Sequence, residues 1–277
     1  MMSICVDARH GLLSLPLALL IAMGAIGAMG GTDAYAWQPD FAGDRDQSLR
    51  WSHSGADGPQ HWGELSPEFS VCATGRLQSP VPLGAAEALG APCQPLRFRY
   101  RSSALYVTND GRALRLGYDQ GSYLTIDGLS YELAEIRFHV PAEHAVDGRV
   151  ADGELQFIHG NNRGDIAIVA VPVVAGARVN QIMRRVIEHA PSVAGEQFYG
   201  RNIGINALFL LPARKHYYAY PGSLTRPPCT EGVRWYVLRD ALEVDVGDLR
   251  RLAQLIGPNA RPLQPLDGRM VTQVCEP

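Results

Sequence analysis

The polar residues with the clearest chemical use lie in two short segments near the middle of the chain. The first carries Glu135, Arg137 and His139 at alternate positions, and the second carries Glu154 and Gln156. Alternate residues of a β-strand project from one face, so the side chains of the first segment would point into one site. Imidazole and carboxylate groups can bind a metal, whereas a guanidinium is cationic and has no lone pair to donate. The spacing therefore allows an ion pair between Glu135 and Arg137, with His139 beside it.

The surrounding sequence predicts mostly β-strands. Short segments of alternating apolar and polar residues, bounded by Gly, Asp or Asn, occur at 96–100, 113–116, 123–126, 136–140 and 155–159. The denser apolar run 165–174 predicts a strand buried on both faces, and helical periodicity appears in 179–189 and 248–255. From Trp37 onward we find no internal repeat, linker or low-complexity tract, so the sequence predicts one β-rich domain over 37–277.

The N-terminal segment predicts export. Arg9 and His10 precede an apolar run at 12–29, and Ala34-Tyr35-Ala36 then supplies small residues before a cleavage point, which indicates a signal peptide over residues 1–36. A permanent membrane anchor is the alternative, but glycines interrupt the apolar run. The mature protein would be periplasmic or extracellular, with no membrane association after cleavage. The net charge of −3 gives no reason to expect nucleic acid as a partner.

Cleavage would leave an even number of cysteines, which favours disulfide bonds in an oxidising compartment. The four are Cys72, Cys93, Cys229 and Cys275. Four cysteines allow three pairings, and the residues alone do not rank them. Buried free thiols are the alternative.

Ordered sequence blocks over about residues 45 to 275 resemble those of the α-carbonic anhydrases. The matching blocks are Gly58-Pro59 with Trp62, Cys72-Ala73-Thr74-Gly75, Gln78-Ser79-Pro80, Pro141-Ala142-Glu143-His144, Tyr220-Pro221-Gly222-Ser223-Leu224-Thr225, and Asn259 with Arg261-Pro262 and Gln264-Pro265. The resemblance implies a mainly β (α+β) fold, a single domain around a large, mostly antiparallel, twisted central sheet with a few short helices. It also implies the disulfide Cys72–Cys229, which leaves Cys93 with Cys275.

The resemblance locates the zinc site of the family, and this sequence departs from it at two of the three ligand positions. The ungapped alignment places these positions at Arg137, His139 and Gln156, so only one imidazole remains. A guanidinium cannot bind zinc, so the usual zinc site cannot form. This Arg, His, Gln pattern is similar to that of the acatalytic carbonic-anhydrase-related proteins.

The residues that orient the zinc ligands in the family also differ. The orienting glutamine is replaced by Glu135, which could neutralise Arg137, while Glu154 keeps its position in the second motif. The alternative to such an ion pair is that Arg137 merely fills the old cavity.

The resemblance assigns further roles in catalysis. The proton-shuttle histidine is replaced by Arg112, which cannot cycle a proton near neutral pH. Thr225, with Glu143 as its hydrogen-bond acceptor, matches the pair that orients zinc-bound hydroxide, and the following position is Arg226. Both members of that pair could persist for structural reasons alone.

The other histidines are predicted to be structural or ordinary. His144 and His159 match buried, hydrogen-bonded family positions, which we favour over a role as relocated metal ligands. The spacing of His53, His61, His189 and His216 does not suit a metal site, so surface positions are expected for them.

These patterns favour an exported, zinc-free binding or recognition protein, with an unknown protein or a small anion as its partner and no cofactor. One alternative is a carbonic anhydrase that hydrates CO2 with relocated ligands or another metal, and zinc would then be its cofactor. Another is a receptor for bicarbonate or a small carboxylate, in which Arg112, Arg137 and Arg226 line the old active-site cone.

Overall fold

The segments that carry the polar residues form the centre of one large β-sheet. A computed structural model describes residues 50–274 apart from 86–87 and 93, and these residues all belong to one compact unit. The predicted signal peptide and the expected Cys93–Cys275 pair lie outside the described residues. No helix in the described part is long and apolar enough to cross a membrane.

Sixteen strands make up most of the ordered structure in the described part of the chain. They are β1 Pro82–Leu83, β2 Ala88–Gly90, β3 Arg97–Arg99, β4 Ser103–Asn109, β5 Leu114–Gly117, β6 Tyr123–Ile126, β7 Leu129–His139, β8 Ala145–Val146, β9 Arg149–Val150, β10 Gly153–Gly160, β11 Ile166–Gly176, β12 Gln197–Ile205, β13 Tyr217–Ser223, β14 Glu231–Leu238, β15 Leu242–Asp245 and β16 Val271–Val274.

The helices are few and mostly short. They are α2 Trp62–Leu65, α3 Val71–Thr74, α4 Gln181–His189 and α5 Val246–Ile256, with 3₁₀ turns η1 Gly55–Asp57, η2 Pro67–Phe69 and η3 Ala207–Leu210. Asn180 caps α4 by accepting hydrogen bonds from the N–H groups of Ile182 and Met183. Asp245 caps α5 in the same way.

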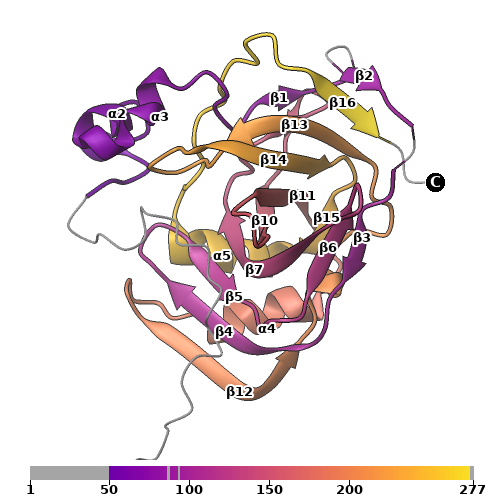
Figure 1. Cartoon of the computed structure of the whole chain (residues 1–277). Helices are drawn as coiled ribbons and strands as arrows, with labels where there is room; N and C mark the ends of the chain where they lie inside the picture. Colours follow the sequence, from indigo (N-terminus) through magenta and orange to yellow (C-terminus); the bar gives the residue numbers. More distant parts are fainter. Residues whose placement is uncertain (1–49, 86–87, 93, 275–277) are drawn as a thin grey trace, which may run out of the picture. The chain divides into compact units, whose positions relative to one another are not determined.

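The large sheet has the order β12-β4-β5-β7-β10-β11-β14-β13-β16-β2, with β15 beside β11, and β6 and β3 continuing outward from β7. Most neighbours are antiparallel, whereas β11 runs parallel to both β14 and β15. Figure 1 shows β7, β10 and β11 in the middle of the sheet, with β12 at one edge. The predicted mainly β fold with a large, mostly antiparallel central sheet is confirmed.

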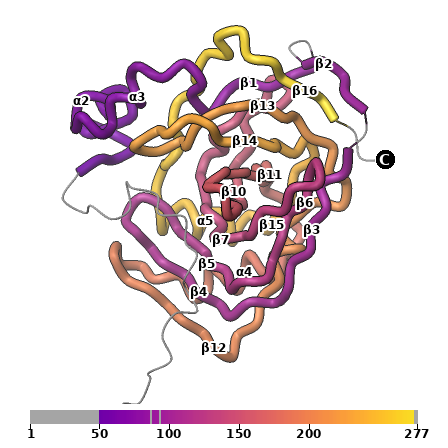
Figure 2. The backbone as a smooth tube through the Cα atoms, in the orientation of Figure 1, coloured from indigo at the N-terminus to yellow at the C-terminus, as the bar shows by residue number. Residues whose placement is uncertain are grey.

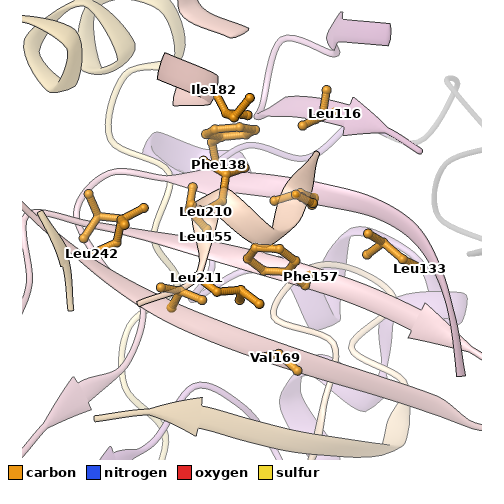
Figure 3. Packing of buried hydrophobic residues seen from close by; sticks show 14 of the residues in the cluster. Leu116, Leu133, Phe138, Leu155, Phe157, Val169, Ile182, Leu210, Leu211 and Leu242 are labelled. Carbon is orange, nitrogen blue, oxygen red and sulfur yellow. The ribbon is translucent and has the colours of Figure 1, made fainter. Parts of the chain in front are cut away.

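The central strands bury both of their faces, which is why β11 is almost continuously apolar. On one face Phe138, Leu155, Phe157 and Val169 pack together with Ile182 of α4 (Figure 3). On β7 and β10 these residues alternate with the polar ones, so the same strands that build this core present Arg137, His139 and Gln156 on the opposite face.

The N-terminal turns are fastened to the sheet by a covalent bond. The disulfide Cys72–Cys229 joins α3 to the loop after Thr225, so the pairing that the resemblance implied is confirmed. Figure 2 shows the chain running from α2 and α3 at the periphery to β16, which lies between β13 and β2.

Candidate functional site

Strands β7 and β10 bring the three ligand-equivalent positions together. In their antiparallel register Gln156 lies opposite Arg137, and Glu154 lies opposite His139. All four side chains are at most 6% exposed, so they form a buried polar layer rather than a solvated surface. The strand framework predicted from the two sequence segments is therefore present, and what differs is the chemistry that it carries.

Arg137 is held by an ion pair. Its Nε donates to Oε1 of Glu135 at 2.6 Å, and Nε and Nη2 of Arg115 approach Oε2 of the same carboxylate at 2.8 and 2.6 Å. Burial alone would raise the pKa of Glu135, but the charges of Arg137, Arg115 and Arg226 outweigh that effect and lower the pKa to about 2. Glu135 thus stays ionised and neutralises part of the positive charge at the old ligand position.

Sequence reasoning predicted the Glu135–Arg137 contact but missed Arg115. The second cation comes from β5, where Arg115 lies directly opposite Arg137. Its only signal in the sequence is its polar position in the alternating segment 113–116. The register between β5 and β7 was needed to place it, and a single sequence does not give that register.

Gln156 is clamped between two carboxylates. Its Nε2 donates to Oε2 of Glu143 at 2.6 Å and to Oε1 of Glu154 at 2.9 Å. Both hydrogens of the amide are therefore engaged. Glu154 also accepts from the backbone N–H and Nδ1 of His144, and these contacts lower its pKa to about 2 although burial acts in the opposite direction.

The expected contact between Thr225 and Glu143 requires a correction. Oε1 of Glu143 accepts from the backbone N–H of Arg261 at 2.9 Å, and Oε2 accepts from Gln156. Among the hydrogen bonds between described residues, none joins Thr225 to Glu143. Both oxygens of the Glu143 carboxylate thus accept from donors other than Thr225, and one of these donors is the amide introduced at position 156.

His139 keeps the orientation that a metal ligand requires. Its Nδ1 lies 3.1 Å from the backbone oxygen of Asn259. Because that oxygen can only accept, we assign the ring proton to Nδ1, which leaves the lone pair on Nε2. Nε2 is buried and has no hydrogen-bond partner among the described residues. A carbonyl that fixes the tautomer in this way is a common support for a metal-binding imidazole.

One imidazole does not make a zinc site. Zinc is held by three or four thiolate, imidazole or carboxylate ligands. At the other two positions Arg137 cannot donate a lone pair, and the Gln156 amide is bound by Glu143 and Glu154. No group of three or more His, Cys, Asp or Glu side chains in the described residues is arranged to hold a metal. The residues present do not fit zinc.

Both remaining family histidines have structural surroundings. His144 lies between Glu154 and the hydroxyl of Tyr220, and His159 lies between the hydroxyl of Tyr100 and the backbone oxygen of Ala167. Burial lowers the pKa of His159 to about 4, so it is neutral near pH 7. Neither ring belongs to a group of possible metal ligands in the described part of the molecule.

An open cleft of about 710 Å³ lies next to this buried layer. Arg112, at the proton-shuttle position, lines the cleft, donates from Nε to the backbone oxygen of Trp51 and stacks 4.5 Å from the centre of the Trp51 ring. Neither Nη atom of Arg112 is bonded to another described residue. The side-chain amide of Asn259 links the backbone oxygens of Arg112 and Phe138, which ties the cleft to the strand that carries His139.

His53 is not the ordinary surface histidine that the sequence suggested. It lines the cleft, and its ring meets those of Trp51 and Trp62 edge-on at 5.3 and 5.8 Å. Burial, followed by neighbouring cations that include Arg112 and Arg137, lowers its pKa to about 3. The surroundings of His53 arise from the folding of the segment that also carries Trp51 and Trp62, and the spacing of the histidines does not predict them.

The three arginines proposed for an anion site do not share one exposed wall. Arg112 lines the cleft, whereas Arg137 and Arg226 are 4% and 6% exposed and are not among the residues that line it. Arg137 is drawn inward by Glu135. The cleft wall contains Arg115 in addition to Arg112, and Asp110 contributes a carboxylate.

Comparisons with known proteins agree over most of the chain. The model of the eukaryotic-type carbonic anhydrase family matches residues 57–275. A carbonic anhydrase from Nostoc sp. is 36% identical over 232 residues, which cover 83% of this chain and 88% of the relative.

Solved structures give the same result. The α-carbonic anhydrase from Thermovibrio ammonificans, in complex with the inhibitor sulfanilamide, has a TM-score of 0.78 at 36% identity and covers 81% of this chain and 99% of its own. Dioscorin complexed with ascorbate has a TM-score of 0.75 at 29% identity and covers 82% and 99%.

Proposed function

This chain belongs to the α-carbonic anhydrase family, and from that premise we propose that it is a zinc-free member that binds a small anion instead of hydrating CO2. One observation carries the proposal. At the first ligand position Arg137 is buried in an ion pair with Glu135, so a cation stands where the family holds a metal. A dication beside a guanidinium would be repelled and would lack two of its three protein ligands.

Two features support anion binding in the cleft. Arg112 lines the cleft with neither Nη atom bonded to another described residue, and a guanidinium binds carboxylates through two parallel hydrogen bonds. Dioscorin, which shares the fold at 29% identity, has been crystallised with ascorbate. Asp110 opposes part of the positive charge, so we expect moderate rather than tight affinity.

A second candidate function is CO2 hydration with a metal held in another way. The relative from Nostoc sp. is named a carbonic anhydrase, and the similarity extends over most of both chains. His139 also keeps the tautomer and buried Nε2 of a potential ligand. This candidate needs further ligands from outside the described residues, because none within them completes a site.

We further propose that the protein is exported and works in the periplasm or outside the cell. The disulfide Cys72–Cys229 supports this location, because disulfide bonds persist mainly in oxidising compartments. The signal peptide predicted over residues 1–36 would provide the route.

Calorimetric titration with bicarbonate, acetate and sulfate tests the anion site, and a CO2 hydration assay on the same preparation tests the second candidate. We expect millimolar to micromolar dissociation constants, or roughly 4 to 8 kcal/mol, and no hydration above the uncatalysed rate. Arg112→Gln should abolish the binding. If no anion binds and hydration is fast, the second candidate is correct; if neither is seen, recognition of a protein partner through the outer surface remains.

A further inference from the structure

The cleft beside Arg112 is much larger than a bicarbonate ion. Its volume of about 710 Å³ lies within the range of about 300–1,000 Å³ that is common for sites of drug-sized ligands. A bicarbonate ion held at Arg112 would leave most of this space to water. The dimensions of the cleft point to a ligand that extends well beyond its anionic group.

The wall of the cleft is rich in groups that hydrogen-bond to hydroxyls. Oδ1 of Asp110 is used by the backbone N–H groups of Arg112 and Ala113, while no described donor engages its Oδ2. Oε1 of Gln197 accepts from the hydroxyl of Tyr106, while no described acceptor takes the hydrogens of its Nε2. The hydroxyls of Ser52 and Thr108 also belong to residues of the wall. Donors and acceptors therefore stand on the same surface as the cation.

An aromatic ring supports the cation of the cleft. Trp51 lines the cleft, and Arg112 stacks against its ring. Trp51 is only 6% exposed, so its indole supports the guanidinium of Arg112 from behind and helps to hold it at the cleft. A cation fixed beside several hydroxyl-binding groups suits a ligand that carries both hydroxyls and an acid.

We infer that the ligand of this cleft is a polyhydroxylated organic acid of the sugar-acid type, whose carboxylate binds Arg112 while its hydroxyls meet Asp110 and Gln197. The inference rests on the proposed anion-binding function and specifies the class of ligand. A simple carboxylate would satisfy Arg112 but leave the hydrogen-bonding groups of Asp110 and Gln197 to water. A neutral sugar would use those groups but not the cation.

Calorimetric titration of the whole mature protein with three ring compounds of similar size separates the contribution of the carboxylate from that of the hydroxyls. D-glucuronate carries hydroxyls and a carboxylate, cyclohexanecarboxylate carries only the carboxylate, and methyl glucoside carries only hydroxyls. We expect glucuronate to bind at least about tenfold more tightly than either of the other two, because each lacks one class of hydrogen bond.

Variants of the cleft residues test which side chains bind the carboxylate and which bind the hydroxyls. Arg112→Gln should weaken glucuronate binding by about tenfold or more, while Gln197→Ala should weaken glucuronate binding several-fold and leave cyclohexanecarboxylate unchanged. Arg149→Gln, which alters an exposed arginine that lines a different pocket, is the matched control and should change nothing. Thermal melting verifies that each variant is folded.

The outcomes distinguish this inference from the proposed function. Equal binding of glucuronate and cyclohexanecarboxylate would overturn the sugar-acid class while leaving anion binding intact. Equal binding of glucuronate and methyl glucoside would contradict any role for the charge. Failure of all three compounds, together with bicarbonate, acetate and sulfate, would refute the anion site itself.

Discussion

The double variant Arg137→His/Gln156→His is expected to bind one equivalent of zinc. The two positions lie directly opposite each other on β7 and β10, and His139 follows on the same face of β7. Three imidazoles would then converge on one point, and Nε2 of His139 is already held ready by the hydrogen bond of Nδ1 to Asn259. Elemental analysis and zinc titration of the variant measure the effect.

Control variants show whether zinc binding by the double variant depends on all three histidines. Each single variant, with two histidines, should bind zinc much more weakly, and His139→Ala in the double variant should abolish binding. Adding Glu135→Gln should strengthen binding, because it removes a charge that was matched to Arg137 and restores an orienting amide. We expect slow CO2 hydration at most, since Arg112 cannot shuttle protons. A double variant that is folded but takes up no zinc would mean that the strand framework no longer has the required geometry.

The second large effect concerns stability. Glu135→Ala should lower the free energy of unfolding by about 3–5 kcal/mol at pH 7, because it removes the carboxylate that faces the buried guanidinium of Arg137 and that of Arg115. Chemical denaturation of the two proteins measures the difference. Glu188→Ala, on the exposed face of α4, is the control and should change stability by no more than about 0.5 kcal/mol.

The pH dependence of this difference gives a further check on its electrostatic origin. The pKa of Glu135 in the folded protein is about 2, below its ordinary value of 4.5. The ionised carboxylate therefore stabilises the fold fully above about pH 4.5, and this contribution is lost as the pH falls from 4.5 toward 2. A Glu135→Ala penalty that stays constant over that range would indicate lost packing rather than lost charge.

The resemblance to the family allowed the fold and the ligand-equivalent positions to be predicted. The motif residues Pro141, Glu143 and His144 align with those of the family without gaps, and this places the residues of both strands. The Glu135–Arg137 pair was one of two alternatives left open by the resemblance together with the period-two geometry of a strand. Contacts that depend on register between distant strands did not follow, and Arg115 is the example.

Two details of the site depend on contacts that the substituted residues make. Glu143 was expected to accept from Thr225, but the amide that replaces the third histidine occupies one of its oxygens. Arg137 was offered as an anion-binding residue for the case that it does not pair with Glu135, and the two side chains do form an ion pair. His53 was overlooked because its neighbours Trp51 and Trp62 surround it only after the N-terminal segment has folded.

The zinc content of the wild-type protein tests the central claim most directly. The mature protein should be produced in zinc-supplemented medium, purified without chelator, dialysed against a moderate competing chelator, and analysed for metal by mass spectrometry. With Arg137 and Gln156 at two ligand positions, we predict that the protein retains only traces of zinc. One tightly held equivalent of zinc after dialysis would contradict the account.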